Sequence, residues 1–198
     1  MTTFDAHHGD TDPASARRDA LVGRLFQAIL GFFDVFGVYL GDRLGLYRAL
    51  AEAGSATSSE LAARTSTDER YIREWLEQQA ASGIIEVIDI GAVAEVRCYT
   101  LPAGHDEVLL DRESLSYMTG LARLAVGAAA PFQALIAAYR TGAGVPYATY
   151  GADVRDGIAE LNRPMFINLL GSEWLPAIPE IHLHLVTRSI VSTMAGAS

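Results

Sequence analysis

A long apolar segment near the N-terminus constrains the fold more than any other feature of the sequence. Between Ala16 and Leu40, apolar side chains recur at a spacing that predicts one helix. They are Leu21, Leu25, Ile29, Phe32, Phe33, Phe36 and Leu40, with Phe26, Leu30 and Val38 widening the stripe. A helix that is apolar on several faces must be buried, and the body that follows is small. We therefore expect a homodimer through Leu21–Leu40, with an ordinary core helix as the alternative.

The same region is not expected to cross a membrane. Its longest apolar stretch, residues 26–40, carries Asp34 and is shorter than the roughly 20 residues that span a bilayer. The segment 1–15 is polar, lacks the order of a signal peptide and is expected to be a disordered tail. Cys98 is the only cysteine, which excludes an intramolecular disulfide and a multi-thiolate metal site. These features favour the cytoplasm.

Three short helices and a hairpin are predicted after the apolar segment. A glycine ends the first helix, a capping box opens the second, and the third presents Ile72, Trp75, Leu76, Gln79 and Ala80 inward. The helices are Gly41–Glu52 with Gly54 at its end, Thr57–Arg64 and Asp68–Ser82, and the strands are Ile84–Ile90 and Val96–Leu101 around Gly91 and Ala92. This order is typical of a winged helix, so residues 16–104 are predicted to hold the dimerisation helix and a winged-helix-like domain.

Residues 105–182 are predicted to form a helical extension. Leu115–Ala130 and Phe132–Tyr139 have helical spacing and are separated by Pro131, while Asp153–Leu170 contains Pro164 as a kink or a new first turn. His105, beside Asp106 and Glu107, is expected in a solvated turn. The fold class is therefore mainly α, a winged-helix-like domain with a small β-hairpin plus a helical extension.

Several ordered blocks of this sequence resemble a bacterial group of class I S-adenosylmethionine-dependent methyltransferases. The blocks include Gly41–Tyr47, Tyr71–Ala80, Arg140–Gly142, Val145–Tyr147, Tyr150–Asp153, Asn162–Pro164 and Glu173–Pro176. The resemblance covers about Leu21 to His182. In that group an N-terminal winged helix and a helical segment precede a Rossmann-like cofactor domain. The resemblance implies that this chain is the N-terminal dimerisation part of such an enzyme.

The cofactor domain of the family would follow next, with a strand that leads into a glycine loop for S-adenosylmethionine. Only 16 residues follow His182 in this 198-residue chain, whereas one βαβ unit takes roughly 30. Residues 183–198 are therefore expected to be an aberrant tail that replaces the cofactor domain. We expect no cofactor site and no catalytic residue in this chain, which would be inactive alone.

Two groups of residues are candidates for contact with a small apolar methyl acceptor. The resemblance implies that Tyr147 and Tyr150 face a substrate cavity at the junction with the cofactor domain, although tyrosines packing a loop would look the same. Asn162, Met165 and Phe166 are similar to a segment that lies over cofactor and acceptor in related O-methyltransferases. Ordinary helix core is the alternative for this second group.

Two other motifs lack what a phosphate-binding site or a metal site would need. The glycines of Gly142-Ala143-Gly144 follow a helix and precede Val145-Pro146, so no helix N-terminus is offered to a phosphate. Glu180, His182 and His184 are too few for a metal site without further ligands.

Two other classes of protein share these features. A winged-helix transcriptional regulator would need a basic third helix, but Asp68–Ser82 is acidic and the chain carries a net charge of −9, so no nucleic-acid partner is expected. A stand-alone dimeric module that binds a small molecule would also fit the apolar helix and the tyrosine loop.

Overall fold

The long N-terminal helix is present and exceeds its predicted length. The computed structural model describes residues 12–181, 183–185 and 187. Helix α1 runs from Pro13 to Arg43 and is capped by the Asp12 side chain, so it begins inside the predicted tail. The rest of that tail lies outside the described residues. By length and composition α1 could also cross a membrane, which differs from the expectation based on residues 26–40 alone.

The three short helices of the predicted winged helix follow α1. They are α2 (Leu46–Ala53), α3 (Ser58–Thr65) and α4 (Glu69–Ala81). The predicted capping box opens α3, because Glu60 N donates to Thr57 Oγ1 at 3.3 Å and Thr57 N donates to Glu60 Oε2 at 2.9 Å. Gly54 ends α2 with a φ of 74°, a backbone conformation that favours glycine.

The hairpin is much shorter than the predicted strands Ile84–Ile90 and Val96–Leu101. Strands β1 (Glu86–Val87) and β2 (Tyr99–Thr100) pair antiparallel, and a 3-10 turn, η1 (Ala94–Val96), lies between them. The other edge of β2 bonds to Ala56, whose N and O pair with Tyr99 at 3.0 and 2.9 Å. Beyond Val87 the β-branched residues face solvent, with Ile90 84% exposed, so no packing extends the strand.

The hydrophobic core lies inside this first region. Ile72, Trp75, Leu76 and Gln79 of α4 are buried, as predicted. They pack with fully buried side chains from the neighbouring elements, among them Leu46, Tyr47, Leu50, Leu61, Ile85 and Tyr99. Trp75 also donates from Nε1 to Gly37 O at 2.8 Å, which fixes the C-terminal third of α1 to α4.

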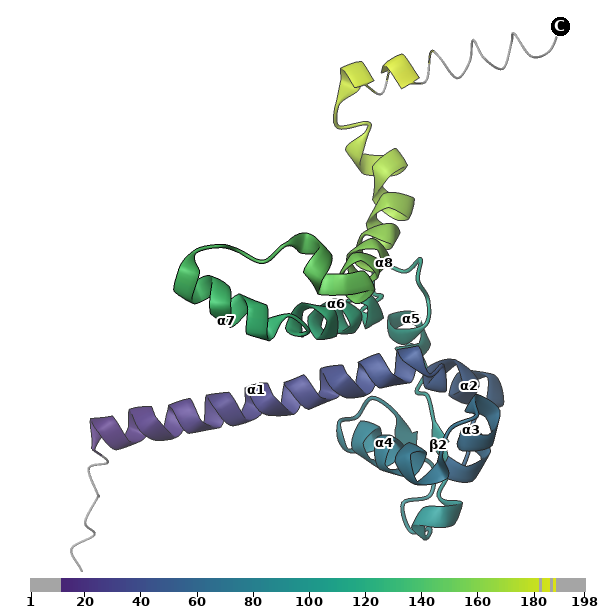
Figure 1. The fold of residues 1–198 in the computed structure, drawn as a ribbon. Helices are drawn as coiled ribbons and strands as arrows, with labels where there is room; N and C mark the ends of the chain where they lie inside the picture. Colours follow the sequence, from purple (N-terminus) through teal and green to yellow (C-terminus); the bar gives the residue numbers. More distant parts are fainter. Residues whose placement is uncertain (1–11, 182, 186, 188–198) are drawn as a thin grey trace, which may run out of the picture.

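The helical extension lies on the opposite side of α1 from α4 (Figure 1). It consists of α5 (His105–Leu109), α6 (Thr119–Ala129), α7 (Phe132–Thr141), the 3-10 turn η2 (Tyr147–Tyr150), α8 (Gly151–Leu169) and the π-helical turn η3 (Leu170–Trp174). The predicted break at Pro131 is present, with α6 and α7 bent by 57°. Helix α8 continues through Pro164, so this proline starts no new helix.

Helices α6 and α8 approach closely at small residues. A Cβ atom on Gly157 of α8 would lie 2.7 Å from Leu124 N and 2.9 Å from Gly120 O of α6. Only glycine leaves room for such an approach of two backbones. The glycines therefore let the two helix backbones pack directly against each other at this point.

Candidate functional site

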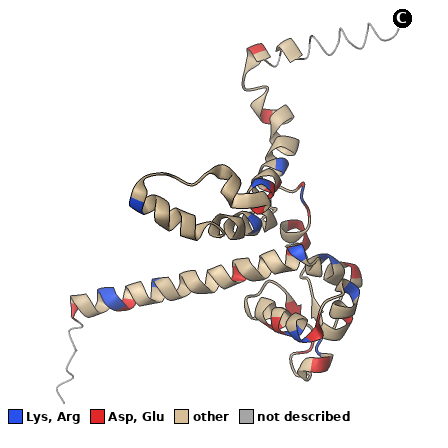
Figure 2. Cartoon of the chain, in the orientation of Figure 1, with Lys and Arg blue, Asp and Glu red and all other residues tan. Residues whose placement is uncertain are grey.

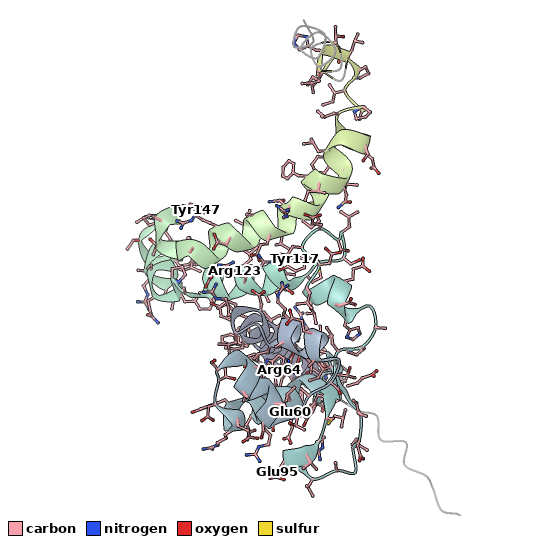
Figure 3. All side chains as sticks on the ribbon, turned by 90° about the vertical axis from the view of Figure 1, so that its right-hand side faces the viewer. Glu60, Arg64, Glu95, Tyr117, Arg123 and Tyr147 are labelled. Carbon is pink, nitrogen blue, oxygen red and sulfur yellow. The ribbon has the colours of Figure 1, made fainter. Side chains whose placement is uncertain are left out.

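The tyrosine loop lies at the end of the extension that is remote from the winged helix. Tyr147 is exposed, and Figure 3 shows it far from Glu60 and Arg64 of α3. Tyr150 is half-buried and lines an open hollow of about 360 Å³ with Leu135, Tyr139 and Val145, among other residues. The structure therefore places one of the two predicted tyrosines against a hollow and the other in solvent.

The second predicted group lies in the C-terminal half of α8. Asn162 and Met165 are half-buried, whereas Phe166 is exposed and its ring meets that of Trp174 edge-on at a centroid distance of 5.7 Å. About 12 residues of helix, or roughly 18 Å at 1.5 Å per residue, separate Asn162 from Tyr150. The two groups are not brought together by the described part of the chain, and their role stays a prediction.

His105 was predicted wrongly as a solvated turn. It is the first residue of α5 and half-buried, and its Nδ1 lies 2.9 Å from Ile84 O. Because a carbonyl can only accept, Nδ1 carries the proton in this bond. His105 and Asp34 line an apolar cavity of about 350 Å³ whose walls include Val35, Val38, Ile84, Val108, Met118 and Leu121. Sequence reasoning missed this cavity because its residues come from separate elements with no shared motif.

An ionic network links the extension to α1. Arg123 of α6, labelled in Figure 3, is largely buried. It contacts Asp153 at 3.0 Å, Asp156 at 2.6 Å and Glu160 at 3.0 Å, all on α8. The Tyr39 hydroxyl of α1 donates to Asp153 at 2.8 Å. This bond and the Arg123 guanidinium lower the pKa of the Asp153 carboxyl. The spacing of the three carboxylates along one helix face was the signal that sequence reasoning overlooked.

Arg73 of α4 and Arg97 of the hairpin form ion pairs with carboxylates of the same region, whereas Arg70 of α4 is exposed and has no ion pair among the described residues. Arg73 lies 3.6 Å from Glu69 and 3.2 Å from Glu95, and Arg97 lies 3.5 Å from Glu77. Red and blue segments alternate over this region in Figure 2. A surface that binds nucleic acid needs unpaired positive charge at the phosphates, and the ion pairs of Arg73 and Arg97 reduce that charge here.

No metal centre is found in the described ranges, where no three His, Cys, Asp or Glu side chains gather as a possible metal site. His182, one of the three side chains considered from the sequence, lies outside the residues that the structure describes.

Comparison with known proteins supports the assignment of the first region. Residues 35–112 match the family model of the Rv2258c-like winged HTH domain. The chain contains a winged helix-turn-helix domain. The match spans the end of α1, α2–α4, the hairpin and α5, so this winged-helix domain includes the buried core described above together with α5, the first helix of the extension. None of the curated proteins matches the chain significantly.

Two solved structures share the fold of the winged-helix domain and the extension. Mitomycin 7-O-methyltransferase MmcR superposes with a TM-score of 0.58 and 20% identity, covering 79% of this chain and 48% of its own. N,N-8-amino-8-demethyl-D-riboflavin dimethyltransferase RosA from Streptomyces davawensis gives a TM-score of 0.53 and 19% identity, covering 73% and 44%. The chain thus spans about half the length of each, and the fold it shares with both is mainly α.

Proposed function

We propose that this chain is the N-terminal region of an S-adenosylmethionine-dependent methyltransferase of the cytoplasm, and that it forms a homodimer through Leu21–Leu40. The observation that carries the proposal is the exposed apolar face of α1 on a winged-helix domain whose fold recurs in two methyltransferases. Large side chains of this face are 38–62% exposed: Leu21, Val22, Leu25, Phe26, Ile29, Leu30, Phe32, Phe33, Phe36 and Leu40. An apolar surface of this extent marks an interaction site.

A second copy fits this face better than a bilayer does. From Asp34 onward α1 is bonded to α4, since Gln78 Nε2 donates to Asp34 Oδ1 at 3.0 Å. The free apolar part, Leu21 to Phe33, then spans about 18 Å, whereas the hydrocarbon core of a bilayer is about 30 Å thick. Figure 2 shows charged residues before and after this part, and Arg24 lies within it. Two antiparallel copies of α1 would cover each other's apolar faces.

The described residues do not fit S-adenosylmethionine. The site of this class needs a parallel sheet and a glycine loop before a helix. The sheet described here is a two-stranded antiparallel hairpin. Gly142 and Gly144 have positive φ, but Pro146 and the short turn η2 follow them. We assign no step of methyl transfer to these residues, and we place the cofactor in a domain outside them.

The extension would contribute contacts to a small apolar acceptor. Tyr150 at the hollow beside α7, and Met165 with Phe166 on α8, offer apolar surface that can close over a ligand. The aromatic pair Phe166–Trp174 gives the second group a preformed shape. Each group would complete its site against another domain or against the second copy.

Sedimentation analysis of the purified chain tests the dimer. We expect the wild type to sediment as a dimer, and Phe33→Asp to produce a monomer because a charge would lie in the apolar interface. Tyr71→Asp is the control, since Tyr71 is 74% exposed on α4 and far along the chain from the proposed interface. A monomeric wild type, or a Phe33→Asp variant that stays dimeric, contradicts the proposal. Binding of the wild type to lipid vesicles without dimerisation would favour a membrane instead.

A further inference from the structure

The cavity beside His105 lies between the winged-helix domain and the extension, away from the tyrosine loop. Its walls come from α1, the turn after α4, α5 and the start of α6. Its volume is about 350 Å³. An apolar cavity of about 150 Å³ holds one benzene ring, so this one has room for about two rings. The half-exposed Met118 and Leu121 stand at its margin, where flexible side chains can adapt to a ligand.

Two polar side chains, His105 and Asp34, break the apolar lining. His105 donates from Nδ1 to Ile84 O, so this nitrogen is already occupied. Asp34 Oδ1 accepts from Gln78 Nε2 at 3.0 Å and from the Ser82 hydroxyl. Among the described residues, Asp34 Oδ2 has no such partner. A ligand must therefore bring donors, and a carboxylate would be repelled by Asp34.

We propose that this cavity binds a small aromatic amine of one or two rings, with its rings against Val38 and Val108 and its amine toward Asp34. The apolar walls supply affinity through burial, as in other small-molecule sites of 300–1,000 Å³. Asp34 supplies the preference for a cation, because it is half-buried and already held in place by two donors. The inference does not rest on methyl transfer and holds for the chain as a binding protein.

Calorimetry with three probes of one ring system tests the proposal: tryptamine, indole and indole-3-acetate. The full chain should bind tryptamine at least tenfold more tightly than indole-3-acetate, with indole between them. Asp34→Asn should remove the preference for tryptamine over indole while indole still binds, because the amide keeps an oxygen for Gln78 and Ser82.

Filling the cavity should abolish binding. Val108→Phe places a ring inside and should weaken tryptamine at least tenfold. Val93→Phe is the matched control, since Val93 lies between β1 and β2 and is 66% exposed. This variant should bind tryptamine as the wild type does. Circular dichroism checks that Val108→Phe is folded. If it is not, Met118→Phe, which also adds a ring at the margin of the cavity, is used in its place.

Three results would overturn the proposal. The first is no binding of any probe at millimolar concentration. The second is equal binding by the wild type and both filled variants. The third is a wild type that is dimeric and binds none of the probes, together with a Val108→Phe variant that is monomeric. This result would show that a second copy occupies the cavity.

Discussion

The winged-helix domain and the helical extension are held together by different interactions. The first buries large apolar side chains completely, among them Leu50, Leu61 and Leu76. The extension joins α6 to α8 through glycines and the Arg123 network, and it leaves large apolar side chains such as Phe132, Ile136 and Phe166 exposed. The difference leads us to expect that the domain is the more stable of the two regions, because the extension relies more on ion pairs than on buried apolar side chains.

The largest effect is expected in the domain. Leu76→Ala removes a fully buried side chain from α4 and should lower the free energy of unfolding by about 2–5 kcal/mol, measured by urea denaturation. Leu44→Ala is the control, because Leu44 is 45% exposed and should lose less than about 1 kcal/mol. Equal losses would mean that the two sites are buried alike, contrary to the described core.

A smaller loss in the free energy of unfolding is expected from a substitution in the extension. Arg123→Met leaves Asp153, Asp156 and Glu160 without their shared cation and should cost about 2–3 kcal/mol. Hydrogen exchange should show the loss in α6 and α8 but not in α2–α4, which would separate the two regions directly. Arg163→Met is the control, because its pair with Glu113 is exposed and contributes about 0–1 kcal/mol. Exchange that rises equally in both regions would show one cooperative unit.

The smallest effect concerns pH. The pKa of Asp153 is lowered in the folded state, so its contribution is present above the ordinary value of about 3.9 and is lost as pH falls through the lowered pKa. Asp153→Asn should therefore lose about 1 kcal/mol at neutral pH and show a shallower fall of Tm below about pH 5 than the wild type. Parallel acid profiles of the two proteins would exclude a contribution from this carboxyl.

The helices of the winged-helix domain could be predicted from sequence because their signals are local. The Thr57–Glu60 capping box, Gly54 and the inward face of α4 all appear as expected. The strands were overestimated, since β-branched residues such as Ile88 and Ile90 indicate strand whether or not a partner strand reaches them.

The site features that were missed depend on contacts between distant segments. The cavity around His105 combines four elements, and the hydrogen bond to Ile84 crosses 21 positions of sequence. The Arg123 network joins α6, α8 and, through Tyr39, α1. The periodicity of a sequence does not indicate which helices pack together, so these contacts could be identified only in the structure.

The two halves of α8 differ in how firmly they are held, because the contact at Gly157 fixes the first half and Pro164 interrupts the hydrogen bonding of the second. The backbone of α8 at Gly157 packs directly against the backbone of α6. Seven residues later, Pro164 has no N–H for the carbonyl of Glu160, so the ladder loses one bond there. Bending is therefore easiest near Pro164, where this bond is missing, and it would change the position of Phe166 and Trp174 relative to Tyr150.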